Sequence, residues 1–272
     1  NCSTLSFKSK TFTVEKVTER ALVKLCTGLL LYQELKEGNM DRSSSLKWMK
    51  TILLILALIC GCYGKPQDLS GTKFTIAAEK SNSFIKLSGD FSKPITAMTM
   101  CQRFFTDQQR DQSLFSLATP SNPTDINLLL LSKGGYNLHI HGGSVTFSGM
   151  PENRNAWISV CATWDSKTGL TQIWANGRRS VSKILKLSGP INGTPSIILG
   201  QNQGSYGGGF VASQSFVGDI TDVNFWDMVI SPCQIKLYMQ GKNFTQGSSL
   251  NWKAMEFTTG ESVFHGLSDF SC

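Results

Sequence analysis

The sequence predicts an all-β protein: a two-sheet antiparallel sandwich with one helix near residues 231–240. Three observations support this fold class. Short segments that alternate polar and apolar residues, or are wholly apolar, recur from residue 73 to residue 201. Gly, Pro, Asn or Asp residues bound these segments, as expected for strands joined by turns. No helical pattern separates them, which favours antiparallel sheets over a parallel α/β arrangement.

The expected strands follow one another along the chain at 73–78, 83–89, 95–106, 113–119, 127–132, 136–147, 157–165, 171–177 and 196–201. One turn between them is specified by its residues. The Asn176-Gly177 pair predicts a tight hairpin turn, because both central residues of such a turn need a positive φ. The strand at 171–177 should therefore pair with the segment that follows it.

A single helix is predicted after Ser231. The serine hydroxyl can cap the first turn, and Pro232 suits the first helical position because its missing N–H has no partner there. An apolar stripe of Ile235, Leu237 and Tyr238 follows, and Gly241 is a plausible stop. The helix is therefore expected to pack one face against the sandwich.

The first 64 residues are expected to lie outside this domain. Residues 49–64, MKTILLILALICGCYG, combine a lysine, an apolar run and small residues, a pattern typical of a secretory signal peptide. The run at 52–59 is too short to cross a bilayer, which takes about 20 residues. Residues 1–48 precede this pattern and are interpreted as upstream sequence translated in frame, or alternatively as a disordered extension. The mature domain, 65–272, is predicted to be extracellular.

Charge says little about partners. The chain carries a net charge of +7, but residues 65–272 contain 17 basic and 14 acidic residues, a net of only +3. No Lys/Arg cluster interleaved with aromatic residues is present, so neither nucleic-acid binding nor a membrane span is predicted.

Cysteine usage supports export. The chain has eight cysteines, and those within 65–272 are Cys101, Cys161, Cys233 and Cys272. Four cysteines in a secreted domain predict two disulfides with three open connectivities, and none has zinc-like spacing. Two N-glycosylation sequons, at Asn192 and Asn243, fit the same route.

Neither catalysis nor a transition-metal site is predicted. No strand carries two acidic residues at alternate positions, as a glycosidase would need, since Asp219 and Asp222 lie three apart. There is no nucleophile elbow. His139 and His141 would share one face of a strand and could hold a metal, but no third ligand is in view. The tryptophans at 157, 164, 174, 226 and 252 are interpreted as core residues, not as a sugar-stacking surface.

Three separated segments carry a family resemblance: VCATWDSKTGLTQIWANGR (160–178), the stretch from 196 to 227, and SLNWKAMEF (249–257). Their order and content resemble the pentraxins, the family of C-reactive protein and serum amyloid P component. The similarity covers nearly all of residues 70–260. One departure is that Ser159 stands where the family signature has a histidine, two positions before Cys161. The resemblance implies a flattened jelly roll with one long helix, usually assembled as a cyclic pentamer.

The resemblance also implies a disulfide pairing. TAMTMCQRFF and ISVCATWD match the two strands that the family joins, so Cys101 is expected to bond to Cys161. Cys233 and Cys272 remain as a second pair, whose bond would tie the chain's end to the helix. The alternative is that Cys272 links protomers or stays free.

Calcium is the cofactor that the resemblance implies, yet its ligand positions have changed. Pentraxins hold two calcium ions mostly through carboxylates, and the corresponding positions here carry Thr124, Asp125, Asn202, Gln203, Gly204, Val211 and Gln214. Of the acidic ligands, Asp125 alone is retained. Asn202, Gln214 and the carbonyl of Gln203 offer neutral oxygens. Because calcium affinity rises with the number of charged ligands, weak or absent binding is predicted.

The phosphocholine pocket is changed as well. The family places a phenylalanine and a glutamate against choline, and this chain has Leu130 and Val145 at the corresponding positions. The resemblance then implies a secreted, multivalent recognition protein of innate immunity and the acute phase. Its expected ligands are phosphocholine, polysaccharide or damaged-cell surfaces, with complement components as further partners. The alternative is a scaffold without calcium-dependent ligand binding, acting through protein contacts or co-assembly with a paralogue.

Overall fold

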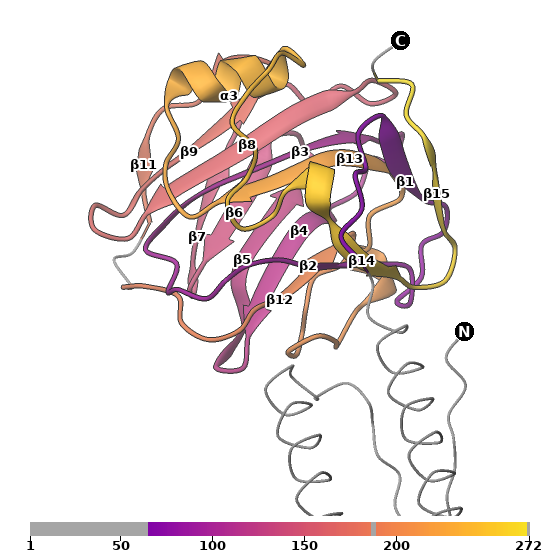
Figure 1. The fold of residues 1–272 in the computed structure, drawn as a ribbon, viewed down its shortest axis with the longest axis horizontal. Coiled ribbons are helices and arrows are strands. Elements are labelled where there is room, and N and C mark those ends of the chain that lie inside the picture. Colours follow the sequence, from indigo (N-terminus) through magenta and orange to yellow (C-terminus); the bar gives the residue numbers. More distant parts are fainter. Residues whose placement is uncertain (1–64, 186–188, 271–272) are drawn as a thin grey trace, which may run out of the picture. The chain divides into compact units, whose positions relative to one another are not determined.

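Two antiparallel sheets face each other across an apolar core in the computed structural model, which describes residues 65–185 and 189–270 (Figure 1). This is the predicted sandwich. The predicted upstream segment and signal peptide, together with Cys272, lie outside the described residues.

One sheet has eight strands and includes both the first and the last strand of the described chain. Its order is β10 (Arg178–Arg179), β9 (Leu170–Ala175), β8 (Ile158–Asp165), β3 (Ala97–Phe105), β13 (Gly218–Trp226), β1 (Thr72–Ile76) and β15 (Val263–Leu267). The short β11 (Lys183–Ile184) also pairs with β9. The sheet therefore ends in β10 and β11 on one side and in β15 on the other, as Figure 1 shows for β11 and β15.

The second sheet has seven strands. Its order is β14 (Glu256–Thr259), β2 (Ile85–Ser88), β12 (Ser196–Leu199), β4 (Gln112–Thr119), β5 (Asn122–Leu130), β6 (Tyr136–Ile140) and β7 (Gly143–Phe147). Along β5 the side chains alternate between two faces. Ile126, Leu128 and Leu130 lie in the core, so Asp125 and Asn127 point to the outer face.

The turn predictions had mixed outcomes. Asn176 and Gly177 have φ values of 44° and 81°, which confirms the predicted hairpin turn. The segment 136–147 was predicted as one strand, and this is wrong. His141 (φ 48°) and Gly142 (φ 83°) form a turn that divides it into β6 and β7. Strands β13, β14 and β15 lie outside the expected ranges. The residues of β14 and β15 are mostly exposed or half-exposed and give no clear alternation.

The predicted helix is α3 (Pro232–Met239). The Ser231 hydroxyl accepts a hydrogen bond from the Gln234 N–H, and Pro232 occupies the first turn as expected. The helix lies over the outer face of the eight-stranded sheet (Figure 1). Its buried Ile235 and Tyr238 pack there with Trp174, Trp226 and two cysteines. The long β12–β13 connection contains one turn of 3-10 helix, η2 (Ala212–Gln214), and a second turn, η3 (Trp252–Ala254), precedes β14.

Most of the tryptophans are core residues, as predicted. Trp164, Trp174, Trp226 and Trp252 are buried, whereas Trp157 is half-buried against Phe105 and Phe270. Within residues 65–185 and 189–270, no helix has the length and apolar character needed to cross a bilayer.

Candidate functional site

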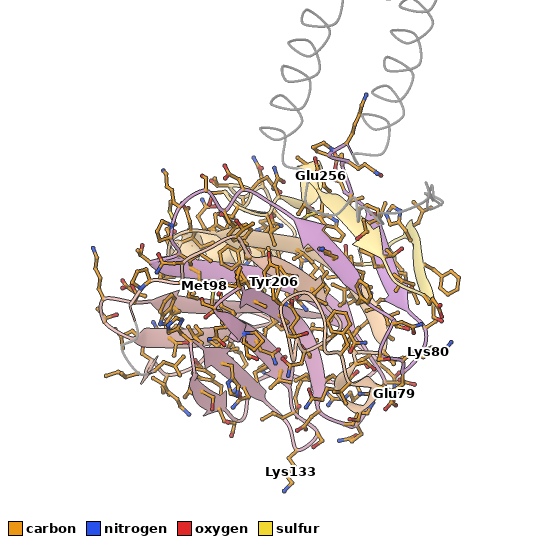
Figure 2. All side chains as sticks on the ribbon, turned by 90° about the horizontal axis from the view of Figure 1, so that it is seen from below. Glu79, Lys80, Met98, Lys133, Tyr206 and Glu256 are labelled. Carbon is orange, nitrogen blue, oxygen red and sulfur yellow. A yellow bond between two sulfur atoms is a disulfide. The ribbon has the colours of Figure 1, made fainter. Side chains whose placement is uncertain are left out.

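The predicted calcium-site residues come together on the outer face of the seven-stranded sheet. We call the loop site the predicted Asp125 on β5, the predicted Asn202, Gln203 and Gln214 on the connection between β12 and β13, and Asn127 on β5, which was not predicted. The same connection carries Tyr206, which is exposed and labelled in Figure 2. Residues that are 75 or more positions apart thus meet at one place.

Asp125 is the only carboxylate of the loop site, and its oxygens are already in use. The side chain is only 1% exposed. Its Oδ1 accepts hydrogen bonds from Asn122 Nδ2 and His141 Nδ1, both at 2.9 Å. Its Oδ2 accepts one from the Thr119 hydroxyl. A carboxylate only accepts, so the His141 Nδ1 must carry the proton.

The amides of the loop site form a chain. The Ser113 hydroxyl donates to Asn127 Oδ1 at 2.8 Å, and Asn127 Nδ2 donates to Asn202 Oδ1 at 2.9 Å. Asn202 Nδ2 then donates to Gln214 Oε1 at 3.1 Å. Each amide oxygen therefore accepts a hydrogen bond from within the protein. The arrangement is neutral and internally satisfied.

Gln203 points its side chain inward. Its Nε2 donates to the carbonyls of Ser116 and Ser196, and its Oε1 accepts from the Gly207 N–H. The Gln203 carbonyl accepts from the Thr124 hydroxyl at 3.3 Å. The oxygen predicted to face a cation is thus shared with Thr124.

The loop leaves no room for a side chain at Gly204. The N–H groups of Gly204 and Ser205 both donate to the Gly208 carbonyl at 3.1 Å. A Cβ at Gly204 would lie 2.7 Å from the Gly209 carbonyl oxygen, closer than real Cβ contacts. Val211, by contrast, is 51% exposed. A carboxylate could be placed at Val211 but not at Gly204 without moving the backbone.

The predicted ligand pocket needs correction. Leu130 is wholly buried in the core and pairs with Tyr136, so no surface ligand can reach it. The half-exposed neighbour Leu129 faces the other side of the sheet. Val145 is half-buried, pairs with Leu138 and packs on the core. The sequence comparison that assigned Leu130 did not take account of which face each residue of β5 occupies.

The two histidines of the predicted metal alternative have separate surroundings. His141 contacts Asp125, whereas His139 lies opposite Asn127 in the β5–β6 register. Burial lowers the pKa of His139. Among the residues that the structure describes, no three His, Cys, Asp or Glu side chains are arranged to hold a metal ion.

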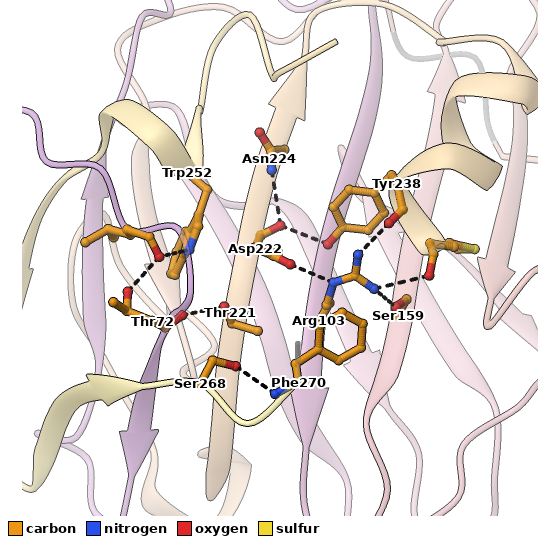
Figure 3. A network of polar contacts seen from close by, with 12 residues as sticks. Thr72, Arg103, Ser159, Thr221, Asp222, Asn224, Tyr238, Trp252, Ser268 and Phe270 are labelled. Carbon is orange, nitrogen blue, oxygen red and sulfur yellow. Dashed lines mark hydrogen bonds and ion pairs between the residues drawn. The ribbon is translucent and has the colours of Figure 1, made fainter. Parts of the chain in front are cut away.

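A second polar group, which the sequence did not predict, lies on the opposite sheet beneath α3 (Figure 3). We call it the helix-face network: Arg103, Ser159, Asp222 and Tyr238. Arg103 is 1% exposed, and its Nε donates to Asp222 Oδ2 at 2.7 Å. Its terminal nitrogens donate to the Ser159 hydroxyl and the Tyr238 carbonyl. An arginine within an apolar strand segment was the available sequence signal.

The backbone aims Asp222 at this arginine. A break in the β13–β3 register between Thr221 and Asn224 contains Asp222, whose φ is 53°. The guanidinium also lies over the ring of Phe270, 4.0 Å from its centroid. Ser159, the departure from the family signature, therefore has a specific role as a hydrogen-bond acceptor of Arg103. Asp219, the other aspartate of this strand, pairs with Lys73 at 2.8 Å.

The cysteines and sequons are placed as follows. Cys101 and Cys161 are bonded, and they lie directly opposite each other on β3 and β8, which confirms the predicted pair. Cys233 is exposed and has no disulfide partner among the described residues. Its bond to Cys272 remains a prediction. Asn192 and Asn243 are both exposed, as glycosylation requires.

A model of the Pentaxin family matches residues 72–265. The chain belongs to the pentraxin family. It is 35% identical to C-reactive protein of Sus scrofa over 212 residues, which are 78% of this chain and 94% of that relative. It is 40% identical to C-reactive protein of Mesocricetus auratus over 202 residues, 73% of this chain and 88% of the relative. With serum amyloid P-component of Cavia porcellus it shares 36% identity over 196 residues, covering 72% and 87%.

A solved pentraxin supports the fold. The heptameric serum amyloid P-like pentraxin of Limulus polyphemus superposes with a TM-score of 0.67 at 20% identity, covering 74% of this chain and 97% of that one. Membership of the pentraxin family places the chain among binding proteins, not enzymes. The aspartates at 219 and 222 accordingly serve structural ion pairs.

Proposed function

We propose that this pentraxin is a secreted, multivalent recognition protein of innate immunity whose ligand face works without calcium. The single observation that carries the proposal is the state of Asp125. Its carboxylate is buried and accepts three hydrogen bonds from protein groups. The amides beside it bond to one another. A cation that needs six to eight hard oxygens finds one occupied carboxylate and neutral partners.

The two ends of the eight-stranded sheet support assembly into a ring. Leu170, Val181 and Ile184 are exposed at the β10–β11 end, and Phe264 and Leu267 at the β15 end. Leu267 is 85% exposed. Two different apolar edges on one protomer suit head-to-tail contact between copies, which closes into rings. The pentamer that the resemblance implies is one such ring.

The two ends of the eight-stranded sheet also carry opposite charges. The β10–β11 end carries Arg178, Arg179 and Lys183, while the exposed Glu261 lies beside β15. Complementary edges fix the order of protomers and disfavour like-to-like contact. A ring that presents several weak sites on one face can gain about 10²-fold or more in avidity.

The ligand face favours hydroxyl-rich ligands. It offers amides and an exposed aromatic side chain, Tyr206, while the one carboxylate of the loop site, Asp125, is buried and leaves no acid for the cation of choline. Polysaccharide is therefore the preferred ligand class, ahead of phosphocholine. Complement components remain expected partners by family resemblance.

The alternative function is a scaffold that binds no ligand by itself and co-assembles with a calcium-competent paralogue. The satisfied amide chain favours it, because Asn127, Asn202 and Gln214 need no outside partner. The same two sheet ends would then contact the paralogue in a ring that contains both proteins.

One experiment tests both the recognition function and the scaffold function. It compares the wild-type domain, residues 65–272, with variants of its two sheet ends. The wild-type protein should elute as a multimer and bind polysaccharide-coated beads equally in calcium and in chelator. Val181→Asp with Leu267→Asp should yield monomers that lose avidity. Met228→Asp is the matched control, because Met228 is equally apolar and 53% exposed but lies at neither sheet end. A multimer that binds no beads would favour the scaffold, and a wild-type monomer would contradict the ring.

A further inference from the structure

We propose that His141 is the residue that excludes divalent cations from the loop site, because its imidazole N–H takes the place on Asp125 that a cation would occupy. This inference rests on the proposed calcium-independent function and names the group responsible for it. The observation that carries it is the 2.9 Å contact between His141 Nδ1 and the buried Asp125 Oδ1.

The backbone at His141 is specialised for this contact. With φ at 48°, His141 is in the left-handed region, which few residues other than glycine adopt and in which Asn, Asp and His are the most frequent of these. It begins the tight turn between β6 and β7, and its N–H also donates to the Asp125 carbonyl at 2.8 Å. Such an outlier points to a function when the surrounding structure holds it in place.

The three donors on Asp125 differ in their access to solvent. Thr119 is buried, whereas Asn122 and His141 are half-exposed. Asn122 donates to Asp125 from three residues away on the same strand, and its own side-chain oxygen accepts from the Thr124 N–H. His141 reaches Asp125 from the neighbouring hairpin turn. Its removal would open the carboxylate without disturbing the strand that carries it.

A cation therefore meets two separate obstacles. The first is the lost carboxylates, which the proposed function already invokes. The second is the hydrogen bond from His141, because His141 and Asn122 together fill both acceptor positions of Asp125 Oδ1, and a metal ion must displace one of them to bind this oxygen. Restoring charge to the loop alone should give a weaker site than restoring charge and removing His141 together.

The test starts from an acidic-loop variant, Asn202→Asp with Val211→Glu. It omits Gly204, where a side chain would strike the Gly209 carbonyl. His141→Gly is then added, since glycine accepts the φ of this turn without strain. The matched control adds His139→Ala instead. This removes the other histidine of the hairpin, which lies opposite Asn127 and not Asp125 in the β5–β6 register.

Calcium titration by calorimetry, with terbium luminescence as a second probe, compares the three proteins. Adding His141→Gly should strengthen calcium binding by about tenfold or more, the scale typical of groups next to a metal site. The His139→Ala control, which removes no donor from Asp125, should leave the calcium affinity unchanged. Equal affinities with and without His141, or no binding by either, would overturn the inference.

A spectroscopic measurement on the wild type is independent of metal binding. Long-range proton–nitrogen correlation should show the His141 ring protonated at Nδ1, as donation to Asp125 requires. A ring unprotonated at Nδ1 would contradict the proposal. Failure of the proposed function is distinguishable, since it would show as tight calcium binding by the wild-type protein itself.

Discussion

The helix-face network and the loop site each pair an aspartate with a nitrogen donor, but they bury opposite members of the pair. In the helix-face network the basic group, Arg103, is 1% exposed, and its partner Asp222 keeps a side chain that is 32% exposed. In the loop site the carboxylate of Asp125 is 1% exposed, and its partner His141 is 34% exposed. In each pair one member has a positive φ, Asp222 in one and His141 in the other.

The difference shows which group each site buries and must keep paired. Arg103 is always charged and buried, so Asp222, Ser159 and the Tyr238 carbonyl must all stay in place around it. Asp125 is held by three donors, and His141 is the one that reaches it from another strand pair and is partly exposed. The helix-face network is thus a structural element, whereas the loop site can be altered through one side chain.

The largest effect is expected from the disulfide that lies beside Arg103 on β3. Replacing both Cys101 and Cys161 with alanine should cost about 4 kcal/mol in the chain-entropy model, for a separation of 60 residues. Urea unfolding of the purified domain measures this loss. The reduced wild type is the control and should lose a similar amount. A variant as stable as the wild type would show that packing alone holds β3 to β8.

Arg103→Met tests the helix-face network directly. The change keeps side-chain length but leaves the Asp222 carboxylate without its ion pair and the Tyr238 carbonyl without this donor. It should cost about 3 kcal/mol in unfolding free energy. Arg103→Lys keeps the charge and loses the planar guanidinium. Its unfolding free energy should lie between those of the wild type and Arg103→Met. A loss below about 0.5 kcal/mol would deny the network a structural role.

Asp125→Asn should lower the unfolding free energy by about 1–2 kcal/mol, less than Arg103→Met does, because the amide keeps one acceptor oxygen for the surrounding donors. Thermal unfolding of this variant beside Arg103→Met ranks the two networks. An Asp125 effect larger than that of Arg103 would reverse the comparison and make the loop site the structural one.

The smallest effect is expected at the exposed pair of Lys73 and Asp269, which are 3.2 Å apart. The hydrogen bond from Lys73 is the main cause that lowers the pKa of Asp269. Because the folded pKa is below the unfolded value, the stabilisation is present above about pH 4 and is lost as pH falls through the folded pKa. Asp269→Asn should cost under about 1 kcal/mol at pH 7 and less at pH 3. A cost that grows on acidification would contradict this sign.

The fold could be predicted wherever local chemistry decides it. The Ser231-Pro232 cap and the Asn176-Gly177 turn act through their own backbone preferences, so the helix and the hairpin were found. The His141-Gly142 turn was missed, because histidine is not a turn signal and its positive φ is stabilised by Asp125, which lies 16 residues earlier.

The candidate site was predictable in its residues but not in its contacts. The resemblance named Asp125, Asn202 and Gln214. The structure bonds Asn202 to Gln214 and to Asn127, which lies two residues after Asp125 on β5. Only the folded chain shows that their oxygens are already occupied. Arg103 and Asp222 are 119 positions apart, and a bulge in β13 determines their contact. No local pattern could have paired them.

Calorimetric titration of wild-type residues 65–272 with calcium tests the central claim most directly. The account predicts a dissociation constant in the millimolar range or weaker, because one carboxylate already bonded to His141, Asn122 and Thr119 cannot offset the dehydration of calcium. A magnesium titration is the control for unspecific heat. Binding at micromolar calcium, with calcium-dependent elution from a phosphocholine resin by chelator, would contradict it.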